Sequence, residues 1–176
     1  YLTGSYNADD GVARMLLEEH IEYEVVSINA SQERINNFEL IIIPSSNTLS
    51  EEEINKLKDF QNKGGALVVI GKGALNNKRD KFIFDLGAKY IGPSDFDMDY
   101  VQVRKELSNN LVSSPFITYL PGIKSEAVED SKILADIKVP YFSRTLEKYN
   151  GHLYAPNKLD KENYPAVLQY NNTCLL

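Results

Sequence analysis

Two short, wholly apolar runs, Leu40–Ile43 and Ala66–Ile70, flank a segment with helical periodicity, and this pattern constrains the fold more than any other part of the sequence. Runs without polar alternation are typical of parallel strands that are buried on both faces. Between them, Ser50 and Glu53 have the spacing of a helix capping box. Gly64–Gly65 then supply the positive φ angles at which a helix can end. The sequence therefore predicts a strand–helix–strand unit.

The rest of the sequence continues this alternation. A first helix is predicted from Asp9 to Glu19, His20 ends it, and a strand follows over Tyr23–Ile28. A weaker strand at Tyr1–Tyr6 would complete a right-handed βαβ unit. Further strands are predicted at Lys89–Ile91, Tyr100–Val103, Ala166–Tyr170 and Thr173–Leu176. We therefore expect a single α/β domain over residues 1–176, with a doubly wound, mostly parallel sheet and helices on both faces, as in flavodoxin-like folds.

Charge and composition narrow the classes of partner. The net charge is -6, from 25 acidic and 19 basic residues, and the sequence has no block of Lys or Arg. We therefore expect neither nucleic acid nor a membrane as a partner, and no stretch approaches the roughly 20 apolar residues of a membrane helix. One cysteine allows no internal disulfide. Because the chain opens at Tyr1 and closes in an apolar run, we expect a piece of a longer protein, and no signal segment is visible from which to assign a localisation.

Four passages of the chain resemble one known family. They are residues 16–27, residues 39–71, the turn Gly92–Phe96 and the passage Val139–Pro156. They are similar to the β-galactosidase trimerisation domain, the middle domain of glycoside hydrolase family 42, which has a class I glutamine-amidotransferase-like fold and follows a catalytic barrel. The resemblance implies a non-catalytic accessory domain of a glycoside-hydrolase-like protein of carbohydrate metabolism. It also implies a homo-oligomer, by family resemblance a trimer, and contact with an adjacent catalytic barrel domain.

A glycine fills the place at which enzymes of the amidotransferase fold keep their nucleophile. In those enzymes the Cys lies in a Gly-x-Cys-x-Gly turn directly after a buried strand. The matching stretch here is Val69–Gly73, which puts Gly71 at the Cys position. The one thiol, Cys174, lies in an apolar run without a basic neighbour to lower its pKa, and we interpret it as an inert core residue. We therefore expect no enzyme activity from this domain.

An acidic stretch is the sharpest metal pattern in the sequence. Asp95, Asp97, Asp99 and Glu106 match four positions of a calcium-binding loop. However, Tyr100 stands where the sharp turn of that loop needs Gly. The alternation of acidic and apolar residues equally fits a strand with one solvent-facing side. We expect no metal site.

The loops Ser45–Asn47 and Gly71–Gly73 follow the two predicted parallel strands. Ligands bind at the carboxyl ends of strands in open α/β sheets, so the alternative function is an amidotransferase-like hydrolase or small-molecule-binding domain that uses these loops. The loops lack the spacing of a phosphate-binding loop, and turn geometry and helix capping explain the same residues. We expect no cofactor.

A third candidate site lies outside the predicted helices and strands, at Tyr141, Arg144, Glu147 and His152. A His with an acid and an Arg suits acid–base chemistry. A glycosidase, however, needs two carboxylates on either side of the scissile bond, and this grouping contains one. Tyr and Arg are enriched at protein interfaces. We therefore interpret these residues as an interface or ligand loop.

Overall fold

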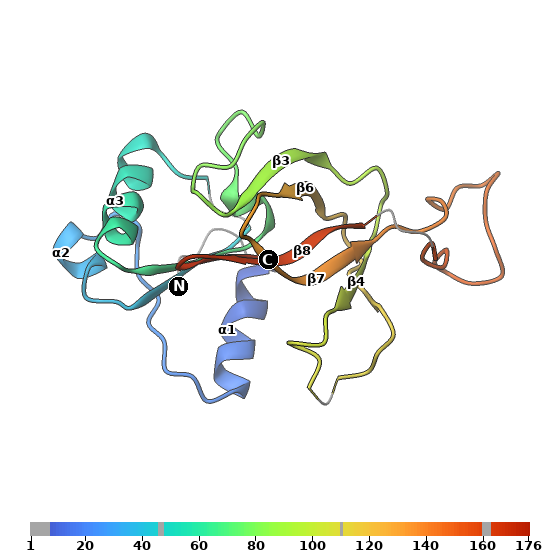
Figure 1. Ribbon diagram of the computed structural model, residues 1–176, viewed down its shortest axis with the longest axis horizontal. Coiled ribbons are helices and arrows are strands. Elements are labelled where there is room, and N and C mark those ends of the chain that lie inside the picture. Colours follow the sequence, from blue (N-terminus) through green and yellow to red (C-terminus); the bar gives the residue numbers. More distant parts are fainter. Residues whose placement is uncertain (1–7, 46–47, 110, 160–162) are drawn as a thin grey trace. The chain divides into compact units, whose positions relative to one another are not determined.

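The computed structural model describes residues 8–45, 48–109, 111–159 and 163–176 (Figure 1). These residues divide into two compact units, one comprising the chain up to Leu86 together with Tyr170–Leu176, the other Gly87–Gln169. The first-strand candidate Tyr1–Tyr6 lies outside the described residues, as do Ser46 and Asn47 of one strand-end loop.

The first unit is built on three parallel strands. Its elements are α1 (Ala8–Glu18), α2 (Gln32–Ile35), β1 (Leu40–Ile43), α3 (Glu51–Asn62), β2 (Ala66–Val69), the 3₁₀ turn η1 (Gly71–Ala74) and β9 (Thr173–Leu175). Strand β2 lies between β1 and β9 and pairs with both in parallel. The predicted strand–helix–strand unit is therefore confirmed, with its second strand one residue shorter than expected.

Helix α3 begins and ends at the residues from which its ends were predicted. The backbone N–H of Ser50 donates to the Glu53 carboxylate at 2.6 Å, and the N–H of Glu53 donates to the Ser50 hydroxyl at 3.4 Å. At the other end, Gly64 has a φ of 98°. A Cβ on Gly65 would lie 2.3 Å from the buried ring of Phe60, so only glycine lets the chain turn this closely over the helix.

His20 ends α1 as predicted. Its φ is 55°, its N–H donates to the Leu17 carbonyl, and the N–H of Ile21 donates to the Leu16 carbonyl. This is the Schellman pattern, with His where Gly is usual. The prediction of a strand over Tyr23–Ile28 is wrong, because these residues form no strand in the structure.

The second unit consists of antiparallel strands. Its elements are β3 (Ala88–Pro93), β4 (Tyr100–Val103), β5 (Phe116–Ile117), β6 (Ile123–Ala127), β7 (Lys132–Lys138) and β8 (Asn163–Tyr170). Strands β8, β7, β4 and β5 are neighbours in that order, and β3 pairs with β6. None of the described residues of this unit is helical.

The predicted fold class, a doubly wound, mostly parallel sheet with helices on both faces, is wrong. The described residues contain more strand, 29%, than helix, 18%. Parallel pairing within each unit is confined to β1, β2 and β9. The physical reason lies after Gly87, where strands follow one another without the crossover helices of a dozen or more residues that parallel neighbours need. In the described part of the chain, no helix is long and apolar enough to cross a membrane.

Candidate functional site

The two strand-end loops come together in the first unit, but backbone fills the space between them. A Cβ on Gly71 would lie 3.8 Å from the Cβ of Ser45, and the Gly71 N–H donates to the Leu176 carbonyl at 2.6 Å. A Cβ on Gly73 would lie 2.3 Å from the carbonyl oxygen of Pro44. The described part of these loops therefore shows tight backbone packing.

The surroundings of the thiol oppose nucleophilic catalysis. Cys174 lies on β9 opposite Val68 of β2. Burial raises the pKa of the Cys174 thiol, which keeps it protonated, whereas a cysteine nucleophile needs a lowered pKa.

Placing a thiol at Gly71 tests whether the turn is an active site that lacks only its nucleophile. Gly71→Cys is expected to fold at a cost of about 1 kcal/mol, because its Cβ would make only an ordinary contact with Ser45 but a side chain is disfavoured at the φ of 46°. We expect no hydrolysis of chromogenic esters or amides, since the contacts of Gly71 are with Ser45 and the Leu176 carbonyl, and neither supplies a general base. The assay should be made in a Cys174→Ser background, so that the native thiol makes no contribution. Turnover above that of the Cys174→Ser protein would contradict the non-catalytic interpretation.

The acidic residues of the calcium pattern serve other contacts. Both carboxylate oxygens of Asp95 accept from the Lys124 ammonium at 2.9 Å. Asp99 is fully buried, and the backbone N–H of Asp97 donates to the Ser143 hydroxyl. Within the described ranges, no three His, Cys, Asp or Glu side chains are grouped so that they could hold a metal ion.

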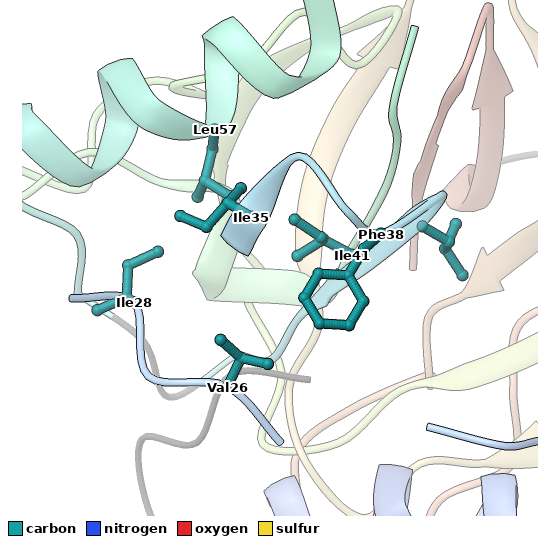
Figure 2. Close-up of a pocket in the computed structure, with 7 residues that line it drawn as sticks. Val26, Ile28, Ile35, Phe38, Ile41 and Leu57 are labelled. Carbon is teal, nitrogen blue, oxygen red and sulfur yellow. The ribbon is translucent and has the colours of Figure 1, made fainter. Parts of the chain in front are cut away.

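A small cavity in the first unit is lined by apolar residues. In Figure 2, Val26 and Ile28, from the segment after α1, lie on the opposite side from Leu57 of α3. The rest of the lining is Ile35, Phe38, Leu40 and Ile41. The cavity volume is about 20 Å³, room for about one water. We interpret it as a packing void.

A broader hollow of about 790 Å³ lies between α3 and the loop of residues 76–83. Its charged lining residues are all exposed and mix cations with anions: Lys58, Lys78, Lys81, Glu51 and Asp80. Because no buried charge is directed into it, this hollow selects no ligand chemistry.

The predicted interface residues lie on a long loop between β7 and β8, residues 139–159, which we call the β7–β8 loop. Figure 1 shows this loop in orange, reaching beyond the ends of the two strands. Its base is closed by backbone hydrogen bonds from Lys158 to Val139 at 2.8 Å and from Tyr141 to Pro156 at 3.0 Å. The loop is therefore held at both ends.

The β7–β8 loop exposes large apolar side chains. Leu146 is 98% exposed and Tyr149 is 68% exposed. The other large apolar side chains of the loop that remain exposed are Tyr141, Leu153, Tyr154 and Leu159. We call these six residues the loop surface. Exposed apolar groups clustered on one segment are typical of an interaction site.

Two residues that the sequence analysis missed lie beside the loop surface. Tyr119 and Leu120, on the turn before β6, are 64% and 71% exposed. The ring of Tyr119 meets that of Tyr154 edge to face, with centroids 5.6 Å apart. The one signal in the sequence is a pair of large apolar residues directly before Pro121.

The structure does not join the side chains of the predicted acid–base grouping. The Arg144 guanidinium donates to the Leu153 carbonyl at 3.3 Å, and the backbone N–H of His152 donates to the Asn150 side chain at 3.1 Å. In the described part of the loop, no hydrogen bond or ion pair links the side chains of Arg144, Glu147 and His152. The arrangement shows no acid–base pair.

Charged residues of the loop are mainly basic. The loop contains three basic residues, Arg144, Lys148 and Lys158, and one acidic residue, Glu147. The net charge of the whole chain is -6. The Lys148 ammonium lies 5.4 Å from the centroid of the Phe142 ring. The loop therefore has a basic excess, opposite in sign to the net charge of the chain.

Comparison with known proteins shows that this fold occurs as one domain within glycoside hydrolases. α-L-Fucosidase isoenzyme 2 from Paenibacillus thiaminolyticus matches with a TM-score of 0.88 and 24% identity, over 98% of this chain and 25% of that one. The cold-adapted β-galactosidase from Rahnella sp. R3 matches with a TM-score of 0.57 and 15% identity, over 93% of this chain and 23% of that one. The chain therefore spans about a quarter of the length of these hydrolases.

The fold is also found outside those enzymes, and the sequence matches one family model. A putative ThuA-like protein from Bacteroides uniformis matches with a TM-score of 0.56 and 15% identity, over 96% of this chain and 72% of that one. The family model is that of the GLMA-like second domain, over residues 4–79. No curated protein matches the chain. The predicted association with glycoside hydrolases is thus confirmed at the level of the fold, whereas the amidotransferase-like assignment stays a prediction.

Proposed function

We propose that this chain is a non-catalytic accessory domain of a glycoside-hydrolase-like protein, and that the β7–β8 loop joins it to a neighbouring subunit and to the catalytic barrel domain. The observation that carries this proposal is the loop surface, which is apolar, exposed and held at its base. The fold of a hydrolase-associated domain supports it, as does glycine at the nucleophile position. Any hydrolase activity then belongs to the barrel of the parent protein.

The proposed assembly is a homo-oligomer with head-to-tail contacts. The loop has a basic excess while the whole chain is acidic, so a loop–loop contact across a two-fold axis brings like charges together. A contact between the loop and a different, acidic surface of the next copy is heterologous, and such contacts close into rings. The smallest such ring is the trimer that the family resemblance implies.

Two substitutions on the loop test this assembly. Leu146→Ser combined with Tyr149→Ser is expected to weaken association about 100-fold, because burying two large apolar side chains contributes about 3 kcal/mol. Sedimentation or light scattering at several concentrations, on the full-length parent and on this chain, measures the effect. The matched control is Met15→Ser with Leu17→Ser, which removes two exposed apolar side chains from α1. A monomeric parent, or an unchanged mass in the loop variant, would contradict the proposal.

A further inference from the structure

One buried carboxylate connects two surface turns of the second unit. Asp99 is fully buried, and one of its carboxylate oxygens accepts from the Gly122 backbone N–H at 2.8 Å. The other lies 3.0 Å from the hydroxyl of Ser94. Ser94 begins the turn before β4, and Gly122 ends the turn before β6. A Cβ on Gly122 would lie 3.3 Å from the carboxylate, so the two turns meet closely at Asp99.

The backbone of Asp99 strengthens the same connection. The N–H of Thr118 donates to the Asp99 carbonyl at 3.0 Å, and the Asp99 N–H donates to the Thr118 hydroxyl at 3.3 Å. That hydroxyl also lies 2.8 Å from the Leu120 carbonyl. Tyr119, between them, has a φ of 58°. The turn that exposes Tyr119 and Leu120 is therefore fixed on Asp99.

Both turns contact the β7–β8 loop. From the turn before β4, the Asp97 N–H donates to Ser143 at 3.3 Å, and the Lys158 ammonium lies 5.7 Å from the centroid of the Phe96 ring. From the turn before β6, the Tyr119 ring packs against the loop. Each contact is modest alone, and each comes from one of the two turns that meet at Asp99.

We propose that Asp99 is a positioning residue for the loop surface: it holds the two turns under the β7–β8 loop, and its ionisation state sets how firmly they are held. The relevance of this device to assembly rests on the proposed function. The positioning itself is a property of the chain alone.

The electrostatics around Asp99 give the direction of the effect. Burial raises the pKa of the Asp99 carboxyl, hydrogen bonds from Gly122 and Ser94 lower it, and the nearby Asp95 and Asp97 raise it further, with a raised pKa as the net result. A protonated Asp99 can still accept from Gly122 and can donate to Ser94. The ionised form accepts both hydrogen bonds more strongly, but the cost of burying its charge outweighs that gain. The two turns are therefore held most firmly when Asp99 is protonated, and less firmly as the pH rises through its pKa.

Hydrogen exchange read by mass spectrometry, on the full chain, tests this inference. Asp99→Ala is expected to speed exchange about tenfold or more in residues 116–122 and 139–158, and to leave residues 40–70 unchanged. Asp99→Asn keeps both hydrogen bonds and is expected to retain protection. The ratio of wild-type to Asp99→Asn exchange at equal pH should rise with pH. Asp130→Asn, which removes the charge of an exposed residue between β6 and β7, is the matched control.

Two results would overturn the inference. Unchanged exchange of the loop in Asp99→Ala, or an equal acceleration in residues 40–70, would show that Asp99 does not position the loop. A wild-type to Asp99→Asn ratio that stays constant with pH would remove the role of ionisation. If Asp99→Ala does not fold, Ser94→Ala, which removes one contact, takes its place with about a threefold expected change. Since exchange is read without assembly, a monomeric parent would defeat the proposed function and leave this result standing.

Discussion

Replacing Gly73 with alanine is expected to lower the free energy of unfolding by about 3 kcal/mol. The new Cβ would lie 2.3 Å from the carbonyl oxygen of Pro44 and 3.0 Å from its carbonyl carbon. Both are backbone atoms directly after β1, so no side-chain rotation relieves the overlap, and η1 must move away from the strand end. Urea denaturation of the two proteins measures the difference.

The matched control for this prediction is Gly11→Ala. Gly11 lies within α1, and an added Cβ there meets nothing within 4 Å. Alanine is expected to stabilise the helix by about 0.5 to 1 kcal/mol. A wild-type denaturation midpoint for Gly73→Ala would contradict the close packing of the strand-end loops. It would also reopen that end of the parallel strands as a ligand site.

Replacing Asp99 with alanine is expected to lower the free energy of unfolding of the second unit by about 2 kcal/mol, because the Gly122 N–H and the Ser94 hydroxyl lose their buried acceptor. Asp99→Asn should be at least as stable as the wild type at neutral pH. Its amide oxygen can accept from Gly122 and its amide nitrogen can donate to Ser94, without a buried charge. Thermal or chemical denaturation of the three proteins over a series of pH values checks both expectations.

The pH dependence of this comparison has a definite sign. The pKa of Asp99 in the folded chain is raised above its ordinary value of 3.8, so the folded state binds more protons than the unfolded state between those two values. The stability contributed by protonated Asp99 is therefore fully present below the ordinary pKa and is lost as the pH rises through the folded one. The wild type should fall behind Asp99→Asn over that interval. A gap that narrows with rising pH would contradict the raised pKa.

The features that the sequence predicted correctly depend on residues close together in the chain. The capping box of Ser50 and Glu53, the turn at Gly64 and the end of α1 at His20 each follow from a few neighbouring residues. Fold class depends on distant pairing instead. Ala135 of β7 pairs with Val167 of β8 in antiparallel register, and nothing in the local pattern of either strand specifies that partner. The wrong fold class arose from extending the strand–helix–strand rule of the first half to the second.

The candidate site also has a part that local sequence predicted and a part that depends on residues far apart in the chain. The tyrosines and Arg144 marked the β7–β8 loop by composition alone. The role of Asp99 could not be predicted, because its partners Thr118 and Gly122 are 19 and 23 residues away. Its acidic neighbours also matched a calcium-binding pattern, which predicts carboxylates that face solvent, whereas the Asp99 side chain is buried.

Because the base of the β7–β8 loop is closed, the amino-acid sequence of the loop can change without disturbing the pairing of β7 with β8. Because the bonds from Lys158 to Val139 and from Tyr141 to Pro156 fix the distance between its ends, lengthening the segment between them costs little, about 0.6 kcal/mol for each doubling. Insertions and substitutions in residues 142–155 can therefore accumulate during evolution without unfolding the domain. Chains that share this scaffold can exchange one binding partner for another by rewriting a single loop.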